Sequence, residues 1–402
     1  MKKNGKKSKK YNICKVFKML VIFFIFYIIY IKNYFKIKIL KYTDDFNEME
    51  KFTKKNLDGY VEFSKLKYLK ISTPKISVVI TVFNGEGYIK PVLRSIQNQD
   101  FLDLEIIIVD DCSKDNSIAK IKELMEEDRR IKLLRNEENR GTLYTKTRGV
   151  LSSSGKYVVT LDHDNLYSNK YTFSILYEEA EKNNLDLLGF SSIVTSIDMK
   201  NLKKEQYLNY IETSIINKPL IKTRFLSFKG GESSTSLCLY LIKTELFRNI
   251  IQKLGTEIIN RNIDSHDDTI MMFLLSRYAN NLKHIKRILH LVFAWPTSNN
   301  QPLIFQNNIK LENREKKKCI SFLTLIEVLF LFTENNAEDK KIASHYLIHL
   351  FLNQDKCKKE PGLIKEATKI CQLFLKNEFI EMKVKNMTNE YLNEINKNNK
   401  LL

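Results

Sequence analysis

The chain has 402 residues, of which 43% are hydrophobic, and this length is enough for one large catalytic core with accessory segments. The formal net charge of +19 would suit an anionic partner, but lysine, asparagine and isoleucine are abundant along the whole sequence. The sequence has no basic stripe interleaved with aromatic residues, no zinc-finger spacing and no C-x-x-C pair among its six cysteines, which argues against nucleic-acid binding, a zinc site and a disulfide-rich scaffold.

The N-terminus has the pattern of a membrane anchor. Residues 1–10 contain six lysines, and residues 19–31 contain no charged residue. This apolar run is shorter than the about 20 residues of a membrane span, but Lys18 and Lys32 can extend their charged ends to the two interfaces. No small-x-small cleavage site follows the run, so we expect an uncleaved signal-anchor helix over residues 11–41 rather than a cleaved signal peptide or an interfacial helix.

The distribution of lysine predicts the orientation of this anchor. Lysine is denser before the apolar run than after it, so residues 1–10 should form a cytosolic tail and the remainder should be luminal. The expected protein is a single-pass type II membrane protein, and its short span suits the thinner membranes of the endoplasmic reticulum or Golgi. Residues 42–74 are polar and mixed in charge, which predicts a stem.

Residues 75–300 alternate buried strand-like runs with helical stretches, which predicts an α/β domain with a mostly parallel sheet flanked by helices. In such sheets ligands bind beyond the carboxyl ends of the strands. Clusters of candidate site residues fall at the ends of three of the expected strands and should therefore meet in one crevice. The expected strands cover residues 76–82, 104–109, 131–134 and 157–161, and the clusters cover residues 81–83, 110–111 and 162–164.

The fourth of these strands ends in Asp162-His163-Asp164. Asp162 and Asp164 are two residues apart, so on extended backbone both carboxylates point to one side. Two hard oxygen ligands at a strand end suit a divalent cation that keeps open positions for phosphate oxygens. His163 should point the other way, toward solvent or packed side chains.

The chain resembles the family 2 glycosyltransferases of the GT-A fold in three stretches, KISVVITVFNGEGYI, EIIIVDDCSKDNS and NRGTLYTKTRGVLSSSGKYVVTLDHDN. The order and spacing of the three stretches make the resemblance specific. It implies an inverting transferase that uses a nucleotide-activated sugar together with Mn²⁺ or Mg²⁺.

The resemblance also implies roles by position. Asp164 would bind the metal with support from Asp162, and Asn165 stands where many members have a further Asp. A turn with a helix cap is the alternative interpretation of residues 110–113. Thr81, Phe83 and Asn84 would lie at the nucleobase, and Asp111, beside Asp110, would accept a hydrogen bond from the uracil N–H. Lys146 would contact the diphosphate, at a position where the family frequently has Arg. Asp162 completes this set of seven nucleotide-binding residues.

A later polar turn that leads into an apolar helix resembles the acidic pair whose second member is the family's general base. That match makes Asp268 the base and Asp267 its neighbour, provided that the carboxylate reaches the acceptor hydroxyl. A capping box from Ser265 to Asp268 is the alternative. Some family members carry a metal-binding His near the position of Trp295, and His290 lies too early in the chain to match it.

The pattern of residues 301–402 predicts a helical extension, and no catalytic or binding motif is recognisable in it. Taken together, the sequence predicts a membrane-anchored hexosyl- or N-acetylhexosaminyltransferase. It would move a sugar from a nucleotide donor, most simply a UDP-sugar, to a hydroxyl of a glycan, a protein or a lipid in one displacement. A membrane-tethered protein that binds a nucleotide sugar without turnover is the alternative, while a glycoside hydrolase would need no nucleotide site.

Overall fold

The computed structural model describes residues 46–59, 66–67, 69, 73–196, 207–208, 214–218, 220–221 and 236–294, and from the C-terminal part residues 321, 324–325, 327–329 and 331–333. The chain divides into the units Met1–Asp45 and Phe46–Leu402, and all described residues belong to the second. The expected tail, the expected anchor helix, Trp295 and most of the C-terminal extension lie outside the described residues. No helix within the described ranges is long and apolar enough to cross a membrane.

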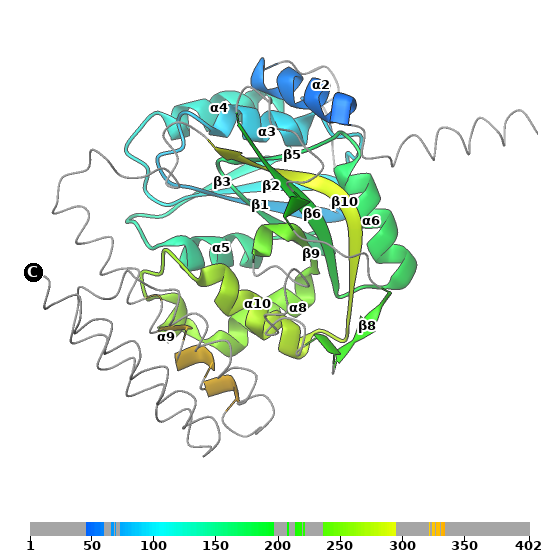
Figure 1. Ribbon diagram of the computed structural model, residues 1–402. Helices are drawn as coiled ribbons and strands as arrows, with labels where there is room; N and C mark the ends of the chain where they lie inside the picture. The colour runs from blue at the N-terminus through cyan, green and yellow to red at the C-terminus, as the bar shows by residue number, and fades with distance from the viewer. Residues whose placement is uncertain are drawn as a thin grey trace, which may run out of the picture. The chain divides into compact units, whose positions relative to one another are not determined.

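A ten-stranded sheet forms the centre of the described domain (Figure 1). The sheet is mixed rather than mostly parallel as predicted. The pairs β1–β2, β1–β4, β2–β3 and β6–β10 are parallel, whereas β9 is antiparallel to both of its neighbours and β5 is antiparallel to β10. Across the sheet the order is β3 (Ile131–Arg135), β2 (Leu104–Asp110), β1 (Ile76–Val82), β4 (Tyr157–Asp162), β9 (Tyr240–Lys243), β6 (Leu187–Ser196), β10 (Asn281–Ala294) and β5 (Asn165–Tyr167). The short strands β7 (Tyr207–Leu208) and β8 (Ile216–Asn217) pair with β6 and β10.

Helices cover both faces of this sheet, which explains why every residue of β1 and β2 is buried and why both strands are apolar without alternation (Figure 1). One face carries α3 (Ile89–Gln97) and α4 (Ser117–Glu127), and the opposite face carries α5 (Thr142–Leu151), α8 (Thr244–Leu254) and α10 (Asp267–Tyr278) (Figure 1). The remaining helices are α6 (Thr172–Asn183) and the short α9 (Thr256–Ile259).

The structure differs from the expected elements at one strand. The sequence predicts a strand over residues 236–242, whereas the chain first forms the 3-10 turn η3 (Leu237–Leu239) and only then enters β9. The backbone N–H of Leu237 donates a 3.1 Å hydrogen bond to Asp268 Oδ2, so the turn is held by a side chain from a distant helix. Local sequence carries no signal of that contact.

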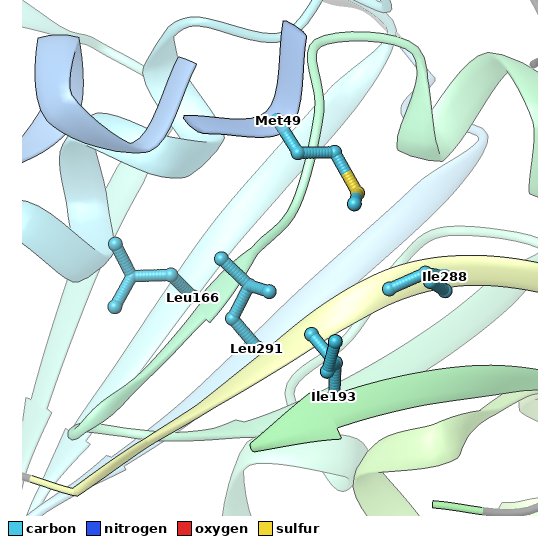
Figure 2. Packing of buried hydrophobic residues seen from close by; sticks show 5 residues of the cluster. All are labelled: Met49, Leu166, Ile193, Ile288 and Leu291. Atoms are coloured by element: carbon cyan, nitrogen blue, oxygen red, sulfur yellow. The ribbon is translucent and has the colours of Figure 1, made fainter. Parts of the chain in front are cut away.

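Part of the predicted stem is packed on the domain. Helix α2 (Phe46–Leu57) lies within residues 42–74, and its buried Met49 enters a hydrophobic cluster (Figure 2). On the same helix the fully buried Asn56 accepts a 2.5 Å hydrogen bond from Asn98 Nδ2, just beyond α3. The folded domain therefore includes residues upstream of the predicted boundary at 75. The cluster consists of Met49, Leu166, Ile193, Ile288 and Leu291.

The described residues between 321 and 333 are helical, as predicted for this part of the C-terminal extension. Leu325, Val328 and Leu329 are fully buried, so this helix has an apolar face that is covered. Arg261, which follows α9, forms a 2.5 Å ion pair with Glu327. The extension is thus attached to the loop that precedes α10.

Candidate functional site

The three predicted polar clusters meet at one edge of the sheet. In the strand register Thr81 on β1 pairs with Asp162 on β4, and Val82 pairs with Asp110 on β2. Because these strands are parallel neighbours, their carboxyl ends lie side by side. The predicted convergence is therefore confirmed by the register.

The loop after β1 is fastened to the loop after β2. The backbone N–H of Asn84 donates to Ser113 Oγ at 2.9 Å, and Asn84 Oδ1 accepts from the backbone N–H of Lys114 at 2.9 Å. Asn84 has a φ of +51°, a conformation that Asn tolerates better than most residues. Thr81 is buried, while the Phe83 ring is 44% exposed at this edge and is available to a flat ligand.

The Asp110 side chain makes structural contacts inside the protein. It is fully buried, and its carboxylate accepts from the backbone N–H of Ser113 and pairs with Arg135 Nε at 3.2 Å. These contacts close the turn after β2, which is the structural role that the turn interpretation of residues 110–113 assigned to this stretch. Asp110 supports the edge of the site.

Asp111 organises the segment that leads into α5. Its Oδ1 accepts from Asn136 Nδ2 and from the backbone N–H of Arg140, both at 2.8 Å, and its Oδ2 accepts from the backbone N–H of Gly141 at 3.0 Å. A carboxylate accepts about four hydrogen bonds, so one position remains for a ligand. The role of Asp111 toward a uracil N–H stays a prediction.

Lys146 on α5 joins the two halves of the site. Its Nζ lies 2.9 Å from Asp267 Oδ2, 2.5 Å from Asp268 Oδ1 and 3.7 Å from Asp162 Oδ1, and its side chain is only 5% exposed. Burial alone would lower the pKa of Lys146, but the three carboxylates raise that pKa well above its ordinary value. The buried ammonium ion therefore stays charged and holds the predicted base beside the end of β4.

Asp268, the predicted general base, has a raised pKa. Burial, together with repulsion from Asp267 and Asp162, raises the pKa of Asp268 to about 7, although Lys146 acts in the opposite direction. A carboxyl group that titrates near neutral pH can accept a proton during turnover and release it afterwards. The Asp268 side chain is 24% exposed, so a substrate can reach it.

The capping box suggested by Ser265 and Asp268 is not formed. Helix α10 begins at Asp267, its N-cap is His266 with a φ of +60°, and no side chain caps it. The Asp268 carboxylate instead accepts hydrogen bonds from Lys146 and from the backbone of Leu237. The acidic pair therefore faces the site.

Asp162 and Asp164 stand together at the end of β4. Burial is the largest influence on the pKa of Asp162 and acts to raise it, but the Lys146 ammonium, the two nearby histidines and a hydrogen bond from Cys238 together outweigh burial, and the pKa is lowered. Burial, and then repulsion from Asp162, raises the pKa of Asp164. Residues 163 and 164 form the turn between β4 and β5, so the extended backbone on which the predicted alternation rests ends at Asp162. His163 packs near Tyr88, with ring centroids 6.0 Å apart.

These two carboxylates fit the protein's share of a Mg²⁺ or Mn²⁺ site. They offer hard oxygen atoms at a strand end, and the Asp162 side chain is 40% exposed. Within the described ranges, no group of three or more His, Cys, Asp and Glu side chains could hold a metal ion. Further ligands would have to come from phosphate oxygens and water.

Two buried residues lie beside Asp162: Cys238, which sequence reasoning missed, and His290, which it set aside as too early in the chain. The Cys238 thiol accepts a 3.8 Å hydrogen bond from Thr160 and donates a hydrogen bond to the Asp162 carboxylate. Burial raises the pKa of this thiol, and the negative charge of Asp162 raises it further. Burial lowers the pKa of His290 to about 4, and its Nδ1 lies 3.1 Å from Ser192 Oγ. Both residues sit in apolar runs, so their spacing gives no functional signal.

Residues 77–250 match the model of glycosyl transferase family 2. Over 92 residues the chain is 40% identical to the GalNAc(5)-diNAcBac-PP-undecaprenol beta-1,3-glucosyltransferase of Campylobacter jejuni. The aligned region covers 23% of this chain and 30% of that protein. Over 179 residues it is 28% identical to the uncharacterized glycosyltransferase EpsJ of Bacillus subtilis, which covers 43% of this chain and 49% of that protein. The chain thus spans less than half the length of these two curated relatives.

The solved structures of S. aureus TarS residues 1–349 share the fold. The TM-score is 0.54 at 15% sequence identity, over 75% of this chain and 81% of that chain. For the same protein in complex with UDP-GlcNAc the TM-score is 0.53, over 73% and 77% of the two chains. The predicted GT-A fold is therefore confirmed.

Proposed function

Because residues 77–250 of this chain form a family 2 glycosyltransferase domain, we propose that the protein transfers a hexosyl or N-acetylhexosaminyl group from a UDP-sugar to a hydroxyl group. The observation that carries the proposal is the position of Asp268, a carboxyl group with a pKa of about 7, 2.5 Å from Lys146. The UDP-GlcNAc complex of the structurally similar TarS supports a uridine nucleotide as donor.

The donor would bind along the carboxyl edge of the sheet. Phe83 and Asn84 would border the nucleobase because the Phe83 ring is exposed there, and the remaining acceptor position of Asp111 would face the uracil N–H. The Lys146 ammonium would bind the diphosphate, where a buried positive charge stabilises a leaving anion more strongly than it would in water.

Transfer would be a single in-line displacement. The acceptor oxygen attacks the anomeric carbon and forms the new C–O bond, while the bond from that carbon to the phosphate oxygen breaks. Asp268 accepts the acceptor's proton, and the nucleoside diphosphate leaves with the electron pair, so the anomeric carbon is inverted. Asp267 shares Lys146 with Asp268 and keeps the pair in place.

A divalent cation fits the same edge. Asp162 and Asp164 would hold Mg²⁺ or Mn²⁺, and the ion would neutralise charge on the diphosphate. Asp162 is also 3.7 Å from Lys146, so one carboxylate would serve both the metal and the ammonium ion.

Glycans, proteins and lipids with free hydroxyl groups remain the acceptor classes of this proposal. We also propose the predicted single-pass type II topology, with the catalytic domain in the lumen of the Golgi or endoplasmic reticulum. The apolar run at residues 19–31 and the lysines before it support this location. Protease digestion of intact microsomes tests it, because a luminal domain is protected until detergent is added.

Calorimetric titration of the full chain with UDP, with and without Mn²⁺, tests the donor assignment. We expect binding that depends on Mn²⁺ in the wild type and is lost in Asp164→Ala. Turnover of a panel of UDP-sugars, compared with Asp268→Asn, then tests catalysis. Absence of UDP binding under both conditions would contradict the donor assignment.

A membrane-tethered protein that binds a nucleotide sugar without turnover is the second candidate. The observation that favours it is the ion pairing of Lys146 with both Asp267 and Asp268, because the proposed general base is then already bound to a cation. Mn²⁺-dependent UDP binding combined with no transfer and no donor hydrolysis across the panel would establish this candidate.

A further inference from the structure

The position of the proposed base depends on an irregular segment. Residues 262–266 connect the turn after α9 to the first residue of α10 and have no regular secondary structure. Asp267 and Asp268 follow directly. Whatever holds residues 262–266 therefore fixes where the base carboxylate stands.

This segment rests on residues 139–143, which we call the seat. Asn262 Nδ2 donates a 2.8 Å hydrogen bond to the carbonyl of Asn139. The carbonyl of Ile263 accepts from the backbone N–H of Leu143 at 3.2 Å and from Thr142 Oγ1 at 3.1 Å. Ile263 is fully buried, so these bonds are shielded from water.

Gly141 is the point of closest approach. A Cβ atom at this position would lie 2.7 Å from the carbonyl oxygen of Ile263 and 2.8 Å from its nitrogen, and the φ of Gly141 is +82°. Both the backbone conformation and the space therefore require glycine. The two segments can approach this closely only because no side chain stands between them.

The seat is held at both ends by charged groups of the site. Asp111 accepts from the backbone N–H groups of Arg140 and Gly141, and Lys146, one turn into α5, bonds to Asp267 and Asp268. Hydrogen bonds and close contacts thus connect Asp111, the carboxylate predicted to face the nucleobase, through Gly141 and Ile263 to the segment that carries Asp268, the proposed general base.

We propose that Asn262 and Gly141 are positioning residues for Asp268. They hold the base-bearing segment on the seat, so that the base carboxylate stands at a fixed place relative to the donor site. Misplacement of a catalytic group by about 1 Å can cost on the order of 10²-fold in rate. Loss of the Asn262 side chain should therefore slow the transfer step without weakening the nucleotide site, whereas a side chain at Gly141 should also strain the backbone that Asp111 holds. The proposal rests on the glycosyltransferase function proposed above.

The test compares Asn262→Ala, Asn262→Asp and Gly141→Ala with the wild type. Asn262→Asp keeps the shape of the side chain and removes the N–H donor to Asn139. We expect kcat to fall by roughly ten-fold or more in each variant. The UDP Kd and the Tm should stay nearly unchanged in the two Asn262 variants, whereas Gly141→Ala should also lower the Tm, because its Cβ would collide with the Ile263 backbone. Glu257→Ala is the control, because the Glu257 side chain is 88% exposed and pairs with Arg261, which does not belong to the seat.

Amide hydrogen exchange over residues 262–270 provides a readout that needs no turnover. We expect faster exchange there in the variants and unchanged exchange in β1 and β4. An unchanged kcat in the Asn262 variants would overturn the proposal. A joint loss of kcat, UDP affinity and Tm in those two variants would also overturn it, because that loss indicates a general structural role. If the wild type transfers no sugar, the proposed function fails, and the exchange result alone decides the positioning role.

Discussion

Lys146 Nζ and Asp268 Oδ1 lie 2.5 Å apart, although the two residues are 122 positions apart in the sequence. The cation proposed for the diphosphate is therefore bound to the proposed general base. The donor subsite and the acceptor subsite share one charged group, and a change in Lys146 should affect both.

Replacement of Lys146 by Met removes this shared charge while keeping a side chain of similar length. We expect kcat/KM to fall by about 10²-fold or more, because the diphosphate loses its ammonium partner and Asp268 loses the charge that keeps it ionised. Lys146→Arg should retain part of the activity. Initial rates with saturating acceptor measure the effect, and Lys120→Met, on the exposed surface of α4, is the control.

Asp268→Asn should abolish proton acceptance without removing the donor site. We expect kcat to fall by about 10³-fold while the UDP affinity stays within a few-fold of the wild type. Steady-state kinetics and calorimetry together separate the two effects. If kcat were retained, another group would have to be the base.

The activity should depend on pH through Asp268. Its pKa is raised to about 7, so the carboxyl group is protonated and inactive as a base at lower pH. We expect kcat/KM to rise through pH 7, where half of the Asp268 carboxyl groups are ionised, and to level off about one pH unit higher. This rise should be absent from the residual activity of Asp268→Asn. A profile that is flat from pH 5 to 8 would contradict the assignment.

Phe83→Ala tests the nucleobase subsite. The ring is 44% exposed, so its removal should cost little folding stability. We expect UDP binding to weaken by about 1–3 kcal/mol if the ring stacks on the base. Calorimetry measures this change, and Leu151→Ala, another exposed apolar residue, should leave the affinity unchanged.

Met49→Ala tests whether α2 belongs to the folded domain. Met49 is 1% exposed and packs in the cluster with Ile193 and Ile288. We expect the free energy of unfolding to fall by about 2–5 kcal/mol, measured by urea denaturation. Lys51→Ala, on the exposed side of the same helix, should be nearly neutral.

The sequence was sufficient to predict the strands β1, β2 and β4 and the meeting of their polar ends. Their apolar runs are buried on both faces, and strand ends of a parallel sheet lie together, so local pattern and topology agree. The antiparallel insertion of β9 was not predictable, because the turn before it depends on a hydrogen bond from Leu237 to Asp268.

The partners of the site residues could not be predicted for the same reason. Asp111 was expected to face a ligand, but it also accepts hydrogen bonds from the backbone of Arg140 and Gly141. Lys146 was expected at the diphosphate, but it also forms ion pairs with Asp267 and Asp268. These contacts join residues far apart in sequence, and no spacing encodes them. The helix α2 was missed because its polar composition resembles a solvated linker.

The carboxylates of Asp162, Asp267 and Asp268 gather around the Lys146 ammonium, and Asp164 lies close enough to Asp162 to be repelled by it, so these five residues carry an excess of negative charge when they are ionised. A bare nucleoside diphosphate is itself an anion and would meet repulsion there. The species that suits this field is the diphosphate already chelated by a divalent ion. The protein should therefore discriminate between chelated and free nucleotide, and the discrimination should shrink as added salt screens the exposed part of the site.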